Sequence, residues 1–150
     1  MRVNDQEKWS ASIGNSCLTT GDILNNWNSM IYTIDINDKW REYAGPGGMN
    51  DPCMIKAGNG WLIFEEEKIH FGLWCLSKLP LLIRCDVTNM SKQIFELLNN
   101  PKLITINQDK LGIQGHKIKT EQPRDNENNN YLKDGNILFL KDCTGGDDQN

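Results

Sequence analysis

One acidic side chain, Asp22, stands where a carboxylate could do chemistry, at the end of the run Thr19-Thr20-Gly21-Asp22. A carboxyl group in such a place can exchange protons with a substrate or accept hydrogen bonds from hydroxyl groups. Asp22 also has a purely structural interpretation, because an aspartate commonly caps the first turn of a helix. The residues alone leave both interpretations of Asp22 open.

Cysteine and histidine, the usual ligands of transition metals, form no recognisable motif. The five cysteines contain no Cys-x-x-Cys pair, and the odd count argues against a complete disulfide framework. Cys75 and Cys85 lie in apolar segments and are expected to be buried. Cys17 and Cys53 could form a metal or redox site only if the fold brings them together. His70 lies on a predicted helix without a second histidine at ligand spacing, so we expect it at the surface or the edge of the core. We therefore predict no metal and no cofactor.

The elements that must position these residues alternate between helices and short apolar runs. Helical spacing predicts one helix from Asp22 to about Glu42 and a second from Phe64 to Lys78. The run Leu81–Ile83 is typical of a buried parallel strand. Ser91 is a suitable cap for a third helix that ends near Leu98. This order favours an α/β fold with a parallel sheet.

The composition indicates the class of protein and gives little information about its function. The chain has 150 residues, of which 38 % are hydrophobic and 24 % charged, as expected for one globular domain. The net charge of −4 gives no reason to expect nucleic acid as a partner. No apolar run approaches the roughly 20 residues that a membrane-spanning helix needs. The first residues lack the apolar core of a signal peptide, and the compartment stays open.

The last part of the chain has a different character. We predict a first region, residues 1–119, and a second, residues 120–150, that contains a polar linker and an uncertain tail. The stretch 121–130 is rich in asparagine, which favours a linker. Residues 137–140, Ile-Leu-Phe-Leu, are expected to form a strand, and residues 144–150 to be disordered.

Four stretches, in order, resemble the α-galactosidase (melibiase) family, in particular its plant members. Residues 13–23 are similar to the family's G-N-S-W-R-T-T-G-D-I. Residues 38–54 are similar to A-G-P-G-G-W-N-D-P-D-M. Residues 80–87 and 106–115 are similar to P-L-L-I-G-C-D and V-N-Q-D-x-L-G-x-Q-G. The resemblance runs from about Trp9 to Lys119.

This resemblance implies an α/β fold that is part of an eight-stranded (β/α) barrel, the TIM barrel. The chain would hold roughly the last three strand–helix units and the start of a carboxy-terminal β region. A whole barrel needs about 250 residues, so the chain is expected to be a carboxy-terminal fragment of the catalytic barrel. In such barrels the active site lies at the carboxyl ends of the strands.

The resemblance also assigns chemistry to the motif residues. Retaining glycosidases use two carboxyl groups about 5–5.5 Å apart, one as nucleophile and one as acid/base. By resemblance Asp22 is the acid/base. The family's nucleophile, an aspartate in a Lys-Tyr-Asp-type motif, has no counterpart in this chain.

Several expected sugar contacts have changed type. By resemblance, Leu18 stands where the family has a sugar-binding arginine, and Cys53 where it has an aspartate that binds galactose hydroxyls. Met49 replaces a tryptophan, whereas Met54 is retained as a candidate substrate contact. An apolar side chain offers no hydrogen bonds and a thiol only weak ones, so we expect a weak galactose pocket.

The resulting expectation is an α-galactosidase-like glycoside hydrolase, whose partners are α-galactoside sugars, that is inactive as this chain alone. The alternative is a non-catalytic remnant that acts as a carbohydrate-binding or interaction module. The open sheet edges of a barrel fragment also favour self-association.

Overall fold

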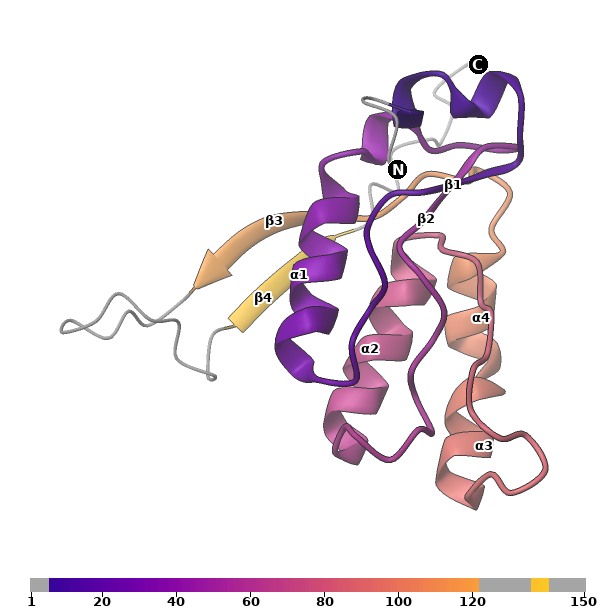
Figure 1. Cartoon of the computed structure of the whole chain (residues 1–150), viewed down its shortest axis with the longest axis vertical. Helices are drawn as coiled ribbons and strands as arrows, with labels where there is room; N and C mark the ends of the chain where they lie inside the picture. Colours follow the sequence, from indigo (N-terminus) through magenta and orange to yellow (C-terminus); the bar gives the residue numbers. More distant parts are fainter. Residues whose placement is uncertain (1–5, 122–135, 141–150) are drawn as a thin grey trace, which may run out of the picture.

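The computed structural model describes residues 6–121 and 136–140. Short 3-10 helices at Gln6–Lys8 and Ser10–Ser12 precede β1 (Ser16–Leu18). The chain continues through α1 (Trp27–Asp38), a 3-10 helix (Arg41–Tyr43), β2 (Met49–Asp51), α2 (Phe64–Leu76), α3 (Lys92–Leu98), α4 (Pro101–Asn107), β3 (His116–Glu121) and β4 (Asn136–Leu140). Figure 1 shows α1, α2 and the α3–α4 pair side by side, with β1 and β2 in front of them.

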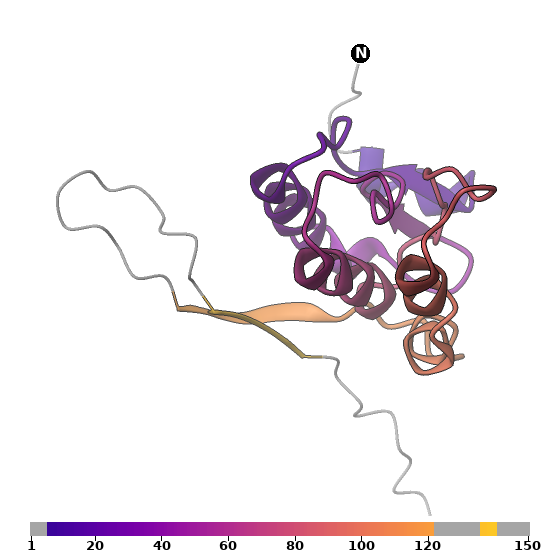
Figure 2. The same ribbon diagram turned by 90° about the horizontal axis from the view of Figure 1, so that it is seen from below.

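The parallel sheet expected from the sequence is present but short. β1 and β2 pair in parallel, with Leu18 opposite Asp51. The predicted strand Leu81–Ile83 is reduced to one parallel bridge, between Ile55 and Ile83. Seen end-on in Figure 2, the helices form one layer, and β1 and β2 lie on one side of it. The described part of the chain is therefore a small mixed α/β structure with parallel strand pairing.

The core lies between this strand layer and the helices. Trp74 and Cys75 of α2, together with Ile55, are completely buried, so the expected burial of Cys75 is confirmed. Cys85, 8 % exposed, is buried as well. Other buried members of the same apolar cluster are Ile23, Met30, Ile34, Phe71, Leu79, Ile94, Leu97 and Leu98.

The first helix was predicted with the wrong start. α1 begins at Trp27 rather than Asp22, and its cap is Asn26, whose Oδ1 accepts a hydrogen bond from the Ser29 amide at 2.8 Å. Asp22 is exposed and five residues upstream of the helix. The prediction failed because Ile23 fits helical spacing yet reaches the core, 2 % exposed, from a loop. This correction removes the capping interpretation of Asp22.

The other helices agree with the sequence except at one boundary. α2 occupies the predicted segment but ends at Leu76, and Lys78 lies beyond it with a φ of 58°. α3 has the predicted cap, since Ser91 Oγ accepts from the Ile94 amide. The sequence analysis did not predict α4, because Asn100-Pro101 indicates the end of the preceding helix. The same two residues start α4, with Asn100 as its cap and Pro101 at the first helical position, where proline is favoured.

The end of the described chain forms an antiparallel pair. β3 pairs with β4, which confirms the strand expected at residues 137–140. Figures 1 and 2 show this pair on the opposite side of the helices from β1 and β2. The predicted linker falls almost wholly, and the predicted tail wholly, outside the described residues. No helix in the described ranges is long and apolar enough to cross a membrane.

Candidate active site

The first two predicted motifs meet at the carboxyl ends of β1 and β2. Because these strands are parallel, the loops that follow them emerge at the same end. Two hydrogen bonds join the loops. The Thr19 amide donates to the Asp51 carbonyl at 2.8 Å, and Thr20 Oγ1 donates to the Pro52 carbonyl at 2.6 Å. The threonines are buried, whereas Asp22, two residues further on, is exposed. The Thr-Thr-Gly-Asp motif thus anchors a loop that presents a carboxylate to solvent.

A buried polar contact fixes the same loop against the helix layer. Thr19 Oγ1 donates to Asn37 Oδ1 of α1 at 2.7 Å, and both side chains are fully buried. Breaking a buried hydrogen bond of this kind is unfavourable, because both polar groups would lack a partner and could not reach water instead. The position of Asp22 is therefore set by α1 as well as by the strands.

Cys53 has a strained backbone in the second loop. Its φ is 129°, a region that residues other than glycine rarely occupy. Two side chains hold its peptide groups in this conformation. Asp51 Oδ1 accepts from the Cys53 amide at 3.0 Å, and the indole Nε1 of Trp74 donates to the Cys53 carbonyl at 3.0 Å. The half-buried Cys53 side chain is thus directed by a turn and by a core tryptophan.

Lys56 and Arg84 add a positive pair that belongs to none of the motif positions selected from the sequence. Lys56 follows Ile55 and Arg84 follows Ile83, the two residues joined by the parallel bridge. Lys56 is only 6 % exposed. Burial, and then the charge of Arg84, lower the pKa of the Lys56 ammonium, whereas Cys53 and Asp22 act in the opposite direction. These four side chains therefore share one electrostatic environment. A lysine directly after an apolar strand residue was the only available signal.

His70 is a correction to the sequence analysis. The ring is fully buried in α2 rather than at the surface or core edge, and it packs on Trp74 with ring centroids 4.0 Å apart. Its Nε2 accepts from the Lys56 amide at 2.9 Å, so the ring fixes the backbone beneath the site. Burial, followed by the nearby Lys56 charge, lowers the pKa of His70 to about 3. The imidazole therefore stays neutral and acts as a structural acceptor.

The remaining predicted residues lie near this end but differ in exposure. Leu18 and Met54 are 46 % and 44 % exposed. Cys17 is buried opposite Asn50 within the strand pair, whereas Cys53 lies two residues past the end of β2. In residues 6–121 and 136–140 no three side chains of His, Cys, Asp or Glu group in a way that could hold a metal ion.

An exposed carboxylate at the shared carboxyl end of parallel strands, backed by helices, is the usual arrangement of an α/β enzyme. Comparison with known proteins identifies the family. A family model described as "Alpha galactosidase A" matches residues 3–109. Alpha-galactosidase 2 of Arabidopsis thaliana is 54 % identical over 117 residues, which cover 78 % of this chain and 30 % of the relative. The alpha-galactosidase of Cyamopsis tetragonoloba is 53 % identical and is matched over 77 % of this chain and 28 % of its own length.

Solved structures agree with this result. The alpha-galactosidase I structure from Mortierella vinacea superposes with a TM-score of 0.74 at 27 % identity, covering 78 % of this chain and 35 % of that one. The alpha-galactosidase of Saccharomyces cerevisiae reaches a TM-score of 0.81 over 89 % of this chain and 34 % of that one. At 23 % identity this second likeness supports the fold alone. The chain belongs to the α-galactosidase (melibiase) family, and it spans about 30 % of the length of the curated relatives that it matches.

Proposed function

We propose that this chain supplies the acid/base part of an α-galactosidase active site, for retaining hydrolysis of terminal α-D-galactosyl groups, and that it is inactive alone. The observation that carries the proposal is the position of Asp22. It is exposed, in the family's motif, at the carboxyl end that β1 and β2 share. In this role Asp22 protonates the leaving oxygen and then activates the water that releases the sugar.

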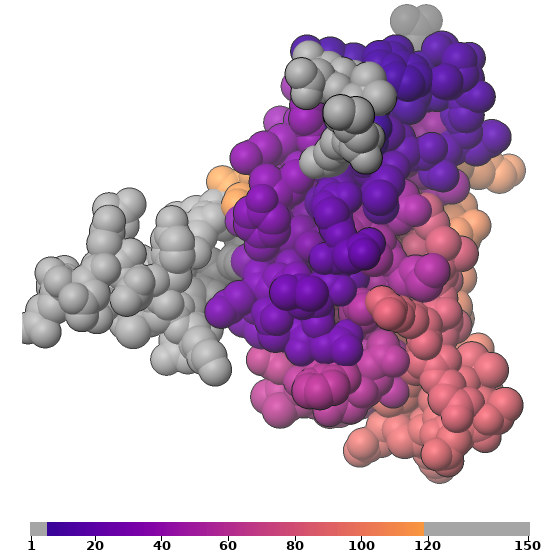
Figure 3. Space-filling model, in the orientation of Figure 1, coloured from indigo at the N-terminus to yellow at the C-terminus, as the bar shows by residue number. Residues whose placement is uncertain are grey.

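The same proposal describes the fold as the last three strand–helix units of a (β/α) barrel. Parallel pairing of β1 with β2, and of Ile55 with Ile83, supports this arrangement. A barrel of about 250 residues closes its sheet completely, whereas the described strands carry exposed apolar side chains. Figure 3 shows that the segment containing β1 and the following loop lies uncovered at the surface. In a closed barrel that surface would face the other strands.

The second carboxylate is the missing chemical component. A retaining mechanism needs a nucleophile about 5–5.5 Å from the acid/base, and by family resemblance it lies on an earlier strand without a counterpart in this chain. Asp51 is a poor substitute, since its Oδ1 already accepts from the Cys53 amide. We therefore expect no covalent glycosyl intermediate and no turnover from the isolated chain.

The sugar pocket is also expected to be weak. Leu18 offers no hydrogen-bond donor where the family has arginine, and Cys53 offers a thiol where the family has a carboxylate. Met54 remains a candidate apolar contact, 44 % exposed at the same end. Each lost hydrogen bond to a buried hydroxyl costs about 1–3 kcal/mol.

A chimaeric enzyme tests this assignment. Residues 6–121 would replace the corresponding segment of the Arabidopsis thaliana relative, which supplies the remainder of the fold. With a chromogenic α-galactoside, we expect weak turnover that falls at least about 100-fold on Asp22→Asn, the usual contribution of general acid–base catalysis. The double change Leu18→Arg and Cys53→Asp should raise kcat/KM. Turnover that survives Asp22→Asn would refute the assignment, and turnover by the isolated chain would refute its inactivity.

A second candidate, an interaction or carbohydrate-binding module, is favoured by the uncovered strand layer. Leu18, Met49 and Ile83 are each at least 40 % exposed, and a short sheet with open edges can pair with another copy. Sedimentation of the folded chain at increasing concentration tests self-association. Galactose-dependent protection against unfolding tests sugar binding, because a ligand that binds only the folded state stabilises it.

A further inference from the structure

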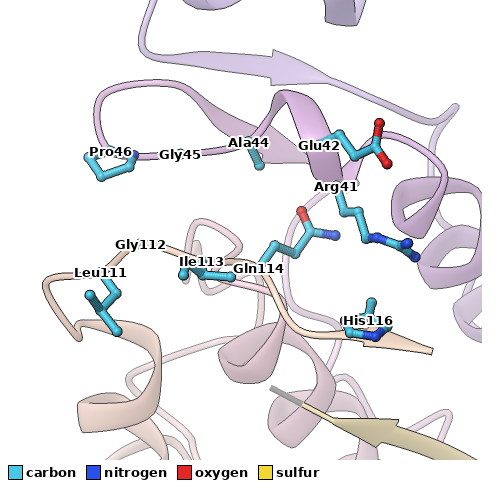
Figure 4. A pocket seen from close by; sticks show the side chains of 10 residues that line it. All are labelled: Arg41, Glu42, Ala44, Gly45, Pro46, Leu111, Gly112, Ile113, Gln114 and His116. Carbon is cyan, nitrogen blue, oxygen red and sulfur yellow. The ribbon is translucent and has the colours of Figure 1, made fainter. Parts of the chain in front are cut away.

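A surface hollow of about 410 Å³ lies between the loop before β2 and the loop after α4. The first loop contributes Ala44 and Pro46, with Arg41 from the 3-10 helix that precedes it, and the second contributes Leu111, Ile113 and Gln114 (Figure 4). Because the first loop precedes β2, the hollow lies at the amino end of that strand, away from the end that carries Asp22. Its volume is within the range of small-molecule sites, about 300–1,000 Å³. It is thus separate from the candidate active site.

The two loops touch at the apolar end of the hollow. Gly112 has a φ of +65°, and a Cβ built on it would lie 2.9 Å from Pro46 Cδ. Only glycine allows both this backbone conformation and this approach. The hollow is therefore closed at the side of Pro46 and Leu111, and its polar residues lie toward the other side (Figure 4).

Gln114 carries a buried donor without a partner in the described structure. The residue is 4 % exposed, and its Oε1 accepts from Asn50 Nδ2 at 3.2 Å. This bond fixes the orientation of the amide, because Asn50 Nδ2 also donates to the Trp40 carbonyl at 2.9 Å. Gln114 Nε2 is left unpaired, and Figure 4 shows the amide directed toward the side chain of Arg41. A buried N–H without an acceptor is unfavourable, so an occupant that accepts a hydrogen bond would satisfy it.

Arg41 provides the charge beside that donor. Its side chain is 41 % exposed, and its contact with Asp38 is long, 3.8 Å between NH1 and Oδ2. Asp38 Oδ1 is already engaged by the Lys117 amide at 3.3 Å. The neighbouring Glu42 carboxylate points away from Gln114 (Figure 4). Arg41 and Gln114 therefore bring donors to the lining of the hollow, to which Glu42 and His116 also belong. A guanidinium beside an amide N–H suits the two oxygens of a carboxylate.

We propose that this hollow binds a small monocarboxylate, with its carboxylate between Arg41 and Gln114 Nε2 and a short apolar body against Pro46, Leu111 and Ile113. The apolar wall gives a preference for length. Each buried methylene should tighten binding about four-fold until the hollow is full. The neutral amide of the same acid should bind far more weakly, because it presents only one acceptor oxygen to the guanidinium.

Titration of the ¹⁵N-labelled full chain with acetate, butyrate and butyramide tests this site by the side-chain signals of Gln114 Nε2 and Arg41. We expect saturable shifts, with butyrate binding about 16-fold more tightly than acetate because it has two more methylenes, and no saturation with butyramide. Arg41→Gln should weaken butyrate binding at least ten-fold. Lys102→Gln makes the same charge change at an exposed position on α4 and should leave binding unchanged.

A second variant keeps the test valid if Arg41→Gln does not fold. Gln114→Glu keeps an oxygen for Asn50 but replaces the free donor with an acceptor, which should pair with Arg41 and abolish butyrate binding. The proposal is overturned by linear, non-saturating shifts with butyrate. It is also overturned by equal affinity for butyramide, or by equal effects of Arg41→Gln and Lys102→Gln.

Discussion

Acid should destabilise the folded chain through His70, and the structure sets the direction and the size of the effect. The pKa of this histidine falls from 6.5 to about 3 on folding. Between these values the unfolded chain binds a proton that the folded chain excludes, so stability decreases as pH falls. Above pH 6.5 this difference in proton binding does not lower the free energy of unfolding. Between pH 6.5 and about pH 3 it lowers that free energy progressively. At about 1.4 kcal/mol per pH unit, the whole difference is on the order of 5 kcal/mol.

His70→Gln isolates this contribution from that of the carboxylates. Glutamine can still accept from the Lys56 amide through its side-chain oxygen, but it does not titrate. The variant should start less stable at pH 7, because it lacks the ring that packs on Trp74. As the pH falls from 6 to 4, its free energy of unfolding should decrease less steeply than that of the unchanged chain. The two slopes should differ by about 1.4 kcal/mol per pH unit.

Urea unfolding, followed by tryptophan fluorescence at several pH values, measures the two slopes. The NMR signal of His70 Cε1–H gives an independent readout and should not shift above about pH 4 while the chain is folded. Parallel stability curves for the two proteins, or a His70 titration near pH 6.5, would refute the argument that burial holds the ring neutral.

Three further predictions concern other parts of the fold. Asn26→Ala should cost about 1 kcal/mol by removing the cap of α1, whereas Asp22→Ala should leave the urea midpoint unchanged; equal effects would contradict the assigned helix start. Lys78→Met should cost about 3 kcal/mol in the same assay, because its buried ammonium donates to the Ile106 and Asn107 carbonyls and to Asp109; a change within 0.5 kcal/mol, the usual size for a surface substitution, would contradict this. Iodoacetamide at pH 8 should label half-buried Cys53 before Cys75, since burial raises the pKa of the Cys75 thiol to about 12, and peptide mass spectrometry would reveal the opposite order.

The sequence predicted elements whose signals are local. The cap and periodicity of α3 were sufficient, because Ser91 and the apolar residues of one short helix determine it. The parallel pairing also followed from the alternation of helices and apolar runs. The start of α1 was not accessible in this way. Ile23 has the spacing of a helical residue, and only tertiary packing shows that it enters the core from a loop.

The candidate site shows the same division. The motif identified Asp22 and the Cys53 loop, because both follow recognisable family patterns. It did not identify the hydrogen bonds that join these loops through Thr20, nor the burial of His70 and Lys56. Those features depend on contacts between segments that are 14 to 32 residues apart in sequence, and no local pattern predicts such contacts.

The two faces of the strand layer differ in how far their apolar side chains are buried. On the helix side, Ile55 and Trp74 are completely buried, so the hydrophobic contacts that support β1 and β2 are already made. On the other side, Leu18 and Ile83 are 46 % and 45 % exposed, and burying the rest of each side chain yields about 1 kcal/mol, roughly half of the value for full burial. In the proposed barrel arrangement, the additional strands of the chimaera should therefore cover this face and stabilise the strand layer. It follows that the chimaeric enzyme should unfold at higher urea than the isolated chain even when Asp22→Asn has removed its activity.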